Sequence, residues 1–141
     1  MPKFAFHLAI PVHDLNRAKE FYAKVLGFKT GRASQKWIDF DCYGHQLVVH
    51  EVDQYKPQNH FNPVDDKDIP VPHFGVVLSW QSFWNFSERL QNFEVKFQIE
   101  PYIRFEGQAG EQATMFFYDP SGNALEFKAF KDPDQLFNTK T

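Results

Sequence analysis

This chain of 141 residues has little cysteine, a small net charge and no long apolar run. The single cysteine, Cys42, excludes an internal disulfide framework and fits a reducing compartment. The net charge is only −3, and the basic residues are interleaved with acids, which argues against a nucleic-acid footprint or a polybasic membrane patch. No apolar stretch approaches the roughly 18 residues of a membrane span, and MPKFAFHL lacks the apolar run of a signal peptide. We therefore expect a cytoplasmic protein that binds neither nucleic acid nor membrane.

Aromatic residues, in contrast, are abundant, at 18% of the chain with 17 phenylalanines. A phenylalanine-packed core accounts for most of this content, because aromatic side chains bury large areas. A pocket for a flat or apolar ligand is the second interpretation, and composition alone does not support it.

The first half of the chain is typical of a β-α-β-β-β unit. Asp14 suits the N-cap of a helix with Leu15, Ala18 and Tyr22 on one face, and Gly27 suits the position after its end. Strands are expected around this helix at residues 3–12, 28–33, 36–42 and 45–52.

The pattern starts again after residues 53–70, DQYKPQNHFNPVDDKDIP, which hold three prolines and many polar residues. We interpret this segment as a linker or loop in which His60 is solvated. A second helix is expected to begin after Ser82, with Phe83, Phe86 and Leu90 inside. Its strands are expected at residues 71–78, 94–103, 112–118 and 123–130, with DPSGN as the last turn.

The two halves therefore form an internal repeat. His7 corresponds to His73 at an offset of 66 residues, and Gly44 corresponds to Gly122 at an offset of 78, whereas the helices align at 68. An internal repeat of this size predicts two copies of one sheet-forming unit that build a concave surface together. We expect one domain over 1–141, made of module 1 (3–52), the linker (53–70), module 2 (71–130) and a C-terminal tail (131–141).

Three residues in apolar strands carry the chemistry. His7 lies in FAFHLAIPV, His73 lies in VPHFGVVL, and Glu126 lies between Leu125 and Phe127. Taken alone, Glu126 is compatible with a solvent-facing position on a half-exposed strand. Together with two equivalent histidines it forms the 2-His-1-carboxylate set that binds Fe(II) or a similar ion and leaves coordination positions free. Coordination would also explain why titratable groups are placed among apolar ones.

The segments HLAIPVHDLNRAKEFYAKVLGF and DPSGNALEF resemble the vicinal oxygen chelate superfamily. This superfamily includes glyoxalase I, fosfomycin-resistance proteins, bleomycin-resistance proteins and extradiol dioxygenases. The resemblance implies an α+β fold in which two tandem βαβββ modules form an eight-stranded cupped mixed sheet. It also implies a divalent metal held by His7, His73 and Glu126, with Fe2+ or Mn2+ favoured and Zn2+ or Ni2+ as alternatives. A small-molecule substrate and a homodimer are further implications.

The residue that corresponds to Glu126 in module 1 is Val48, four residues after Gly44. Glyoxalase I-like proteins carry a second carboxylate there, so the resemblance argues against glyoxalase I activity. We expect a metal-dependent, dioxygenase-like enzyme that binds its substrate through neighbouring oxygens. The alternatives are a metal-dependent lyase or thiol transferase of the glyoxalase or fosfomycin-resistance type, and a metal-free protein that sequesters a drug.

Three further residues are candidates around the metal. Gln46 and His50 share strand parity with Val48, so they would face the cavity if Val48 does. Gln46 is a candidate for a substrate hydrogen bond and His50 for a general acid or base, although His50 fits a rim position equally well. Arg104 is a candidate clamp for a substrate oxygen, and an ion pair with Glu106 or Glu111 is the alternative. The glycines 107 and 110 make the segment around them a candidate lid.

Overall fold

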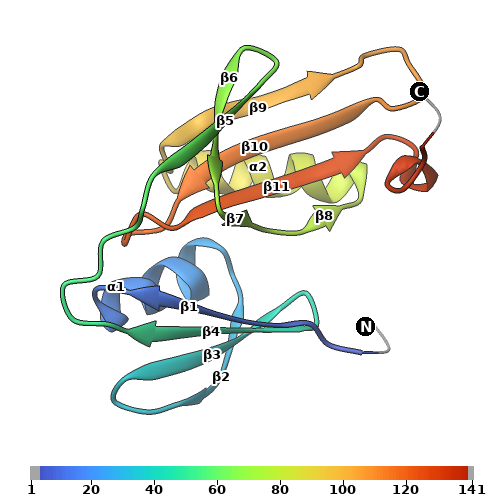
Figure 1. The fold of residues 1–141 in the computed structure, drawn as a ribbon. Helices are drawn as coiled ribbons and strands as arrows, with labels where there is room; N and C mark the ends of the chain where they lie inside the picture. The colour runs from blue at the N-terminus through green and yellow to red at the C-terminus, as the bar shows by residue number, and fades with distance from the viewer. Residues whose placement is uncertain (1–3, 140–141) are drawn as a thin grey trace. The chain divides into compact units, whose positions relative to one another are not determined.

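The computed structural model describes residues 4–139. Residues 1–3 and 140–141, where the first predicted strand begins and the predicted tail ends, lie outside the described residues. The chain divides into two compact units, drawn in Figure 1. Unit 1 runs to Gln58 and takes in Asp119–Asn123, whereas unit 2 holds Asn59–Tyr118 and the chain from Ala124 onward.

Unit 1 is the predicted β-α-β-β-β arrangement. Its four-stranded sheet has the order β1-β4-β3-β2, in which β1 runs parallel to β4 and the other neighbours are antiparallel. The Asp14 side chain caps the helix as predicted, by accepting a hydrogen bond from the Arg17 N–H, and Gly27 follows the helix with a φ of 81°. The elements are β1 (His7–Val12), α1 (Leu15–Lys19), its π-helical continuation η1 (Glu20–Val25), β2 (Lys29–Ala33), β3 (Trp37–Cys42) and β4 (His45–Glu51).

The turn Asp119–Asn123 belongs to unit 1 because it is hydrogen-bonded to the helix and to β1. The buried Tyr22 hydroxyl donates to Asp119 Oδ2 over 2.8 Å, and Asn123 Nδ2 donates to the Pro11 carbonyl over 2.7 Å. Asp119 Oδ1 accepts from the backbone N–H groups of Ser121 and Asn123. The pKa of Tyr22 is well above its usual value, mainly because the side chain is buried and secondly because the Asp119 carboxylate is close to it.

Unit 2 repeats the arrangement with a broken first strand. Its sheet has the order β7-β11-β10-β9, and β8 also pairs with β11. Phe86 of the helix packs on Phe127 with ring centroids 4.7 Å apart, which places α2 on one face of the sheet (Figure 1). The elements are β7 (His73–Phe74), β8 (Val77–Leu78), α2 (Trp80–Asn92), β9 (Phe97–Arg104), β10 (Gln112–Tyr118), β11 (Ala124–Phe130) and, in the predicted tail, η2 (Pro133–Gln135).

The interpretation of residues 53–70 as a linker or loop is wrong over its second part. This part holds the antiparallel hairpin of β5 (His60–Val64) and β6 (Lys67–Val71), so His60 is an exposed strand residue. Asp65 and Asp66 have φ values of 52° and 60°, the left-handed pair that a two-residue hairpin turn requires. A two-stranded sheet consists of edges only, so it tolerates the prolines that argued for a loop.

The predicted cap of the second helix is also wrong. Helix α2 begins at Trp80, and the Ser79 hydroxyl oxygen, rather than that of Ser82, accepts the capping hydrogen bond, from the Ser82 N–H. The N-caps Asp14 and Ser79 are therefore 79 − 14 = 65 residues apart instead of the predicted 68. At this offset Ala18, Phe21 and Tyr22 correspond to Phe83, Phe86 and Ser87, and all six are buried.

The α+β class and the two βαβββ modules are confirmed. The strands of the predicted eight-stranded sheet belong to a four-stranded sheet in unit 1 and a five-stranded sheet in unit 2. Among residues 4–139, no helix is long and apolar enough to cross a membrane. Cys42 is a buried free thiol, and burial raises its pKa to about 11.

Candidate functional site

His73 and Glu126 meet in unit 2. The Nε2 atom of His73 lies 3.1 Å from Glu126 Oε1, with 27% and 15% of the two side chains exposed. Glu126 Oε2 accepts a hydrogen bond from the Thr114 hydroxyl, and His73 Nδ1 lies 2.7 Å from the Pro70 carbonyl oxygen. The interpretation of Glu126 as a residue that simply points to solvent is therefore wrong.

The local sequence explains how these side chains are brought together. In the parallel pairing of β7 with β11, His73 lies opposite Ala124 and Phe74 opposite Leu125, which places Gly75 next to Glu126. A Cβ atom on Gly75 would lie 1.5 Å from the Glu126 carbonyl oxygen. Only glycine allows β7 and β8 to approach β11 so closely, and this approach holds His73 beside Glu126.

The hydrogen bonds of this pair determine where its protons lie. The Pro70 carbonyl only accepts hydrogen bonds, so His73 Nδ1 must donate to it. A neutral His73 then turns the lone pair of Nε2 toward Glu126 Oε1 at 3.1 Å, which is repulsive unless a proton or another cation lies between the two atoms. In the metal-free protein the proton fills this role: the hydrogen bond to Glu126 is the main cause of a raised His73 pKa.

The pKa of Glu126 responds to the same contacts. Burial, the largest single influence, would raise this pKa, but hydrogen bonds from His73 and Thr114 and the charge of Lys128 together lower it. Glu126 is thus held as a carboxylate whose Oε1 atom faces an imidazole nitrogen.

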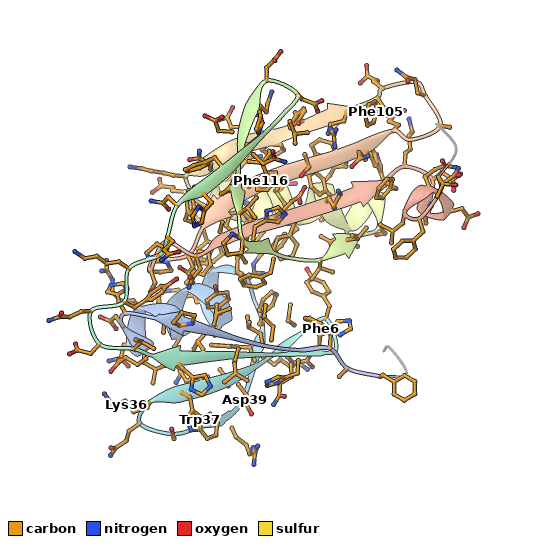
Figure 2. All side chains as sticks on the ribbon, viewed as in Figure 1. Phe6, Lys36, Trp37, Asp39, Phe105 and Phe116 are labelled. Carbon is orange, nitrogen blue, oxygen red and sulfur yellow. The ribbon has the colours of Figure 1, made fainter. Side chains whose placement is uncertain are left out.

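An apolar wall adjoins the pair. His73 packs edge-on against Phe116, with ring centroids 5.1 Å apart. Phe116 of β10, labelled in Figure 2, forms a buried cluster with Ile69 and Ile99. Tyr102 packs against the same cluster. Ile69 comes from β6, so the hairpin that the sequence did not predict supplies part of the wall.

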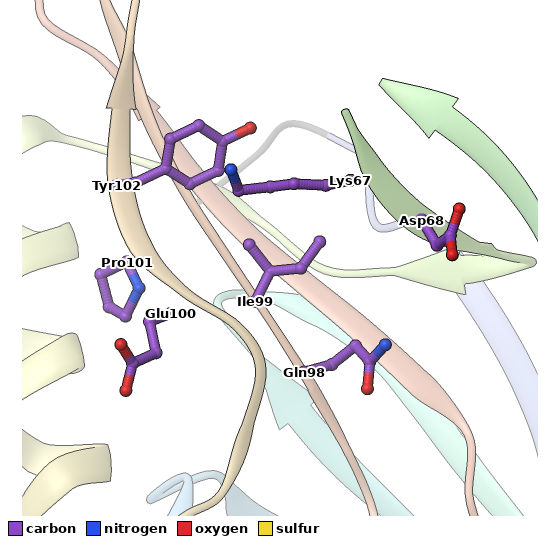
Figure 3. Close-up of a pocket in the computed structure, with 7 residues that line it drawn as sticks. All are labelled: Lys67, Asp68, Gln98, Ile99, Glu100, Pro101 and Tyr102. Atoms are coloured by element: carbon purple, nitrogen blue, oxygen red, sulfur yellow. The ribbon is translucent and has the colours of Figure 1, made fainter. Parts of the chain in front are cut away.

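The hairpin is fastened to β9 by polar contacts. Asp65 at its tip pairs with Arg104 and accepts a hydrogen bond from the Tyr102 hydroxyl over 3.1 Å. The Lys67 ammonium lies 4.4 Å from the centre of the Tyr102 ring. Between β6 and β9 runs an open groove of about 550 Å³, shown in Figure 3. Its lining residues are Lys67, Asp68, Gln98, Ile99, Glu100, Pro101 and Tyr102.

This arrangement corrects the expectations for Arg104. Its ion pair is with Asp65, and neither Glu106 nor Glu111 is its partner. The hydrogen bond from Arg104 is the main cause of a lowered Asp65 pKa. Buried Glu111 instead pairs with Lys131 and accepts a hydrogen bond from the Gly107 N–H. Arg104 therefore fastens the hairpin in this structure.

In unit 1, His7 lies on the edge strand β1, directly opposite Gln46 of β4. His7 Nδ1 lies 2.7 Å from Gln46 Oε1, and Gln46 Nε2 donates to Asp39 Oδ2 over 3.3 Å. Asp39, labelled in Figure 2, is only 8% exposed and lies opposite Val48. His7 itself is exposed.

The two histidines nevertheless share one proton arrangement. The Asp39 carboxylate only accepts, so the Gln46 amide must turn its nitrogen to Asp39 and its oxygen to His7. His7 Nδ1 is then the donor, like His73 Nδ1. In both rings the Nε2 atom is left as the ligating nitrogen, which is how second-shell hydrogen bonds orient metal-binding histidines.

His50 is a residue of β4 in unit 1. It is exposed, and it is four residues beyond Gln46 on β4, about 13 Å away at about 3.3 Å per residue. Val48 is buried at 5% exposure and carries no second carboxylate. The module alignment that identified Val48 agrees with the strand pairing. His7 faces Gln46 and His73 faces Ala124, and 124 − 46 = 78 is the offset found between the turn glycines.

The three predicted ligands belong to different units of the chain. Within residues 4–139 no group of three or more His, Cys, Asp or Glu side chains is arranged for a metal ion. His7 belongs to unit 1, whereas His73 and Glu126 belong to unit 2. The pair in unit 2 is the part of the set that the structure brings together.

Comparison with known proteins places the sequence. The family model of the Glyoxalase/Bleomycin resistance protein/Dioxygenase superfamily matches residues 5–127. The chain belongs to this superfamily. The resemblance inferred from the sequence and the glyoxalase/dioxygenase-like fold are thus confirmed.

Solved structures of superfamily proteins agree with this assignment. A glyoxalase/bleomycin resistance protein/dioxygenase from Alicyclobacillus acidocaldarius is 34% identical, with a TM-score of 0.80 over 97% of this chain and 98% of that one. The fosfomycin resistance protein FosX from Listeria monocytogenes is 18% identical, with a TM-score of 0.69 over 96% and 100%. A lactoylglutathione lyase from Agrobacterium tumefaciens is 18% identical, with a TM-score of 0.64 over 92% and 96%. The last two share the fold.

The donor set of this superfamily member fits a divalent ion. Two ligands that each lie about 2.1 Å from a metal, at right angles, are about 3 Å apart. His73 Nε2 and Glu126 Oε1 are 3.1 Å apart, and Pro70 and Thr114 engage the opposite ends of the two groups, which leaves these two atoms facing each other. Imidazole and carboxylate suit Mn2+, Fe2+ and Zn2+ alike.

Sequence reasoning missed four residues that contact the candidate side chains: Asp39 in unit 1, and Thr114, Lys128 and Asp65 in unit 2. Strand parity could have identified Lys128, which shares its face with Glu126, and Asp39 is an acid in an apolar strand just as Glu126 is. Thr114 and Asp65 act through partners 12 and 39 residues away in the chain, so no local pattern indicates them.

Proposed function

We propose that this protein is a divalent-metal-dependent enzyme that binds a small substrate through two neighbouring oxygens. His7, His73 and Glu126 would hold the metal, with Fe2+ or Mn2+ favoured over Zn2+ and Ni2+. The observation that carries the proposal is the His73–Glu126 pair, whose facing lone pairs need a cation and whose remaining atoms are already engaged. FosX, which shares the fold, has been crystallised as a variant with Mn(II) and a dihydroxypropylphosphonic acid.

When bound, the metal would supply Lewis acidity and, as iron, the capacity to activate O₂. The protein's own groups position the donors. Pro70 holds the tautomer of His73, the pair Gln46 and Asp39 holds that of His7, and Thr114 orients Glu126. Ile69, Ile99 and Phe116 exclude water on one side and favour a substrate with an apolar part there.

A three-ligand set supports dioxygenase-like chemistry best, because it leaves several positions for the substrate and O₂. Val48 in place of a second carboxylate argues against the glyoxalase I reaction. In this proposal Gln46 orients His7, Arg104 fastens the hairpin, and His50 takes no part in proton transfer, since it is exposed and distant from Gln46.

A metal-dependent lyase or thiol transferase of the glyoxalase or fosfomycin-resistance type is the second candidate. The observation in its favour is Lys128, whose ammonium lies 3.9 Å from Glu126 Oε2 and supplies a cation for an anionic substrate. A homodimer and a cytoplasmic location remain parts of the proposal that rest on the sequence and on the family resemblance.

Metal binding tests the proposal directly. We expect wild-type protein, purified without chelator and titrated with Mn2+ by calorimetry, to bind one ion per chain. The His73→Ala variant should bind it about 100-fold more weakly, since one of three ligands is lost. His50→Ala, which removes an exposed histidine of unit 1, is the matched control and should bind like wild type.

Two outcomes would contradict the metal site. One is an absence of binding by the wild type, which would leave a metal-free, drug-sequestering protein as the better account. The other is equal binding by the wild type and His73→Ala. Oxygen uptake by the Fe2+-loaded protein with vicinal diols then separates dioxygenase chemistry from addition to an epoxide, which consumes no O₂.

A further inference from the structure

Lys128 is a cation beside the proposed ligands His73 and Glu126. It lies two residues after Glu126 on the same face of β11, and its ammonium is 3.9 Å from Glu126 Oε2. Its side chain is 27% exposed and its ammonium lies 5.6 Å from the centre of the Phe130 ring. Across the sheet, Lys128 of β11 pairs with Thr114 of β10, and Thr114 pairs with Tyr102 of β9. These three residues form a polar row across the strands. The neighbouring row consists of Glu126, Phe116 and Ile99.

Three cations of the hairpin and the sheet, Lys67, Arg104 and Lys128, have different partners. Arg104 is matched by Asp65, and Lys67 lies on the Tyr102 ring. Lys128 has Glu126 as its counter-charge, at a distance at the limit of an ion pair.

A divalent ion bound to Glu126 and His73 would leave the charge of Lys128 without a full counter-charge from Glu126. The single charge of Glu126 would then be shared between a divalent ion and Lys128, which leaves a net charge of about +2 for these three groups. In a partly buried site such an excess is costly unless an anion neutralises it, and it favours ligands of opposite charge.

Resting on the proposed function, we infer that the substrate is a small anion and that Lys128 binds it. The two neighbouring oxygens of such a substrate face the metal, and at least one of them, or an adjoining carboxylate oxygen, accepts a charge-assisted hydrogen bond from the Lys128 ammonium. Lys128 is thus a substrate-binding residue that selects anions over neutral molecules of the same shape.

Oxalate, oxamate and oxamide test this selection, because all three present two neighbouring oxygens while their charge changes from −2 to −1 to 0. Binding to the Mn2+-loaded protein is measured by calorimetry for the wild type, Lys128→Gln and Lys128→Arg. We expect the wild type to prefer oxalate, and Lys128→Gln to lose about tenfold or more in oxalate affinity with little change for oxamide. Lys128→Arg should keep most of the preference.

The affinity for Mn2+ alone separates substrate binding from a structural role. Removing a cation next to Glu126 should leave Mn2+ affinity equal or higher in Lys128→Gln. Lys24→Gln, which makes the same charge change at an exposed site of unit 1, should match wild type throughout. Equal oxalate affinity in wild type and Lys128→Gln, or a parallel loss of Mn2+ affinity, would overturn the inference while the metal site stands. Absence of Mn2+ binding by the wild type would overturn both proposals.

Discussion

Replacement of Gly75 by alanine should destabilise the protein by about 3 kcal/mol or more and abolish metal binding. The new Cβ atom would lie 1.5 Å from the Glu126 carbonyl oxygen and 2.6 Å from its carbonyl carbon. Both are backbone atoms, so the clash is not relieved by a side-chain rotation. β7 and β8 must move away from β11, which breaks their hydrogen bonds and separates His73 from Glu126.

The free energy of unfolding in urea and the Mn2+ affinity measure the two effects of Gly75→Ala. Gly110→Ala is the matched control, because its Cβ atom would meet only a Phe105 ring carbon at 4.0 Å. We expect Gly110→Ala to change the free energy of unfolding by less than about 1 kcal/mol. A Gly75→Ala variant with the stability of wild type would show that the close approach of β7 and β8 to β11 is not needed.

Asp119→Ala should cost about 3 kcal/mol of stability. The Asp119 carboxylate is 5% exposed and accepts hydrogen bonds from the Tyr22 hydroxyl, from two backbone N–H groups and from the Asn123 amide. Alanine leaves these donors without their acceptor. Tyr22→Phe removes a single donor, and it should therefore cost about 1 kcal/mol.

Thermal and urea unfolding check this order of effects. Asp134→Ala, at an exposed position of η2, is the control for loss of an aspartate and should stay within about 0.5 kcal/mol of wild type. If Tyr22→Phe were as damaging as Asp119→Ala, the turn would be held by the tyrosine hydroxyl alone rather than by the whole network.

Much of the fold was predictable because short local motifs, namely helix caps and turn glycines, recur in both modules. Asp14 and Gly27 mark the ends of the first helix, and the turn glycines Gly44 and Gly122 align the last strands of the two modules. The alignment even paired Val48 with Glu126, as the strand register does. The N-cap of α2 was placed wrongly because Ser79 and Ser82 are only three residues apart. Each is a serine followed by an apolar helix face, so the local sequence does not distinguish between them.

The hairpin of β5 and β6 was missed for a different reason. Its residues are largely polar and include Pro63 and Pro70, and most of what stabilises it comes from distant partners such as Arg104 and Ile99. The same holds within the site. His73 and Glu126 were predicted as ligands from the repeat, whereas the contacts that orient them come from neighbouring strands and a loop carbonyl.

We propose above that His7 and His73 would bind one metal together with Glu126. Pulsed electron paramagnetic resonance of the Mn2+-loaded protein tests it, because a coordinated imidazole nitrogen modulates the electron spin echo. We predict modulation from two nitrogens in the wild type, from one in His7→Ala and in His73→Ala, and none in the double variant. A His7→Ala protein whose modulation equals that of the wild type would contradict the three-ligand site.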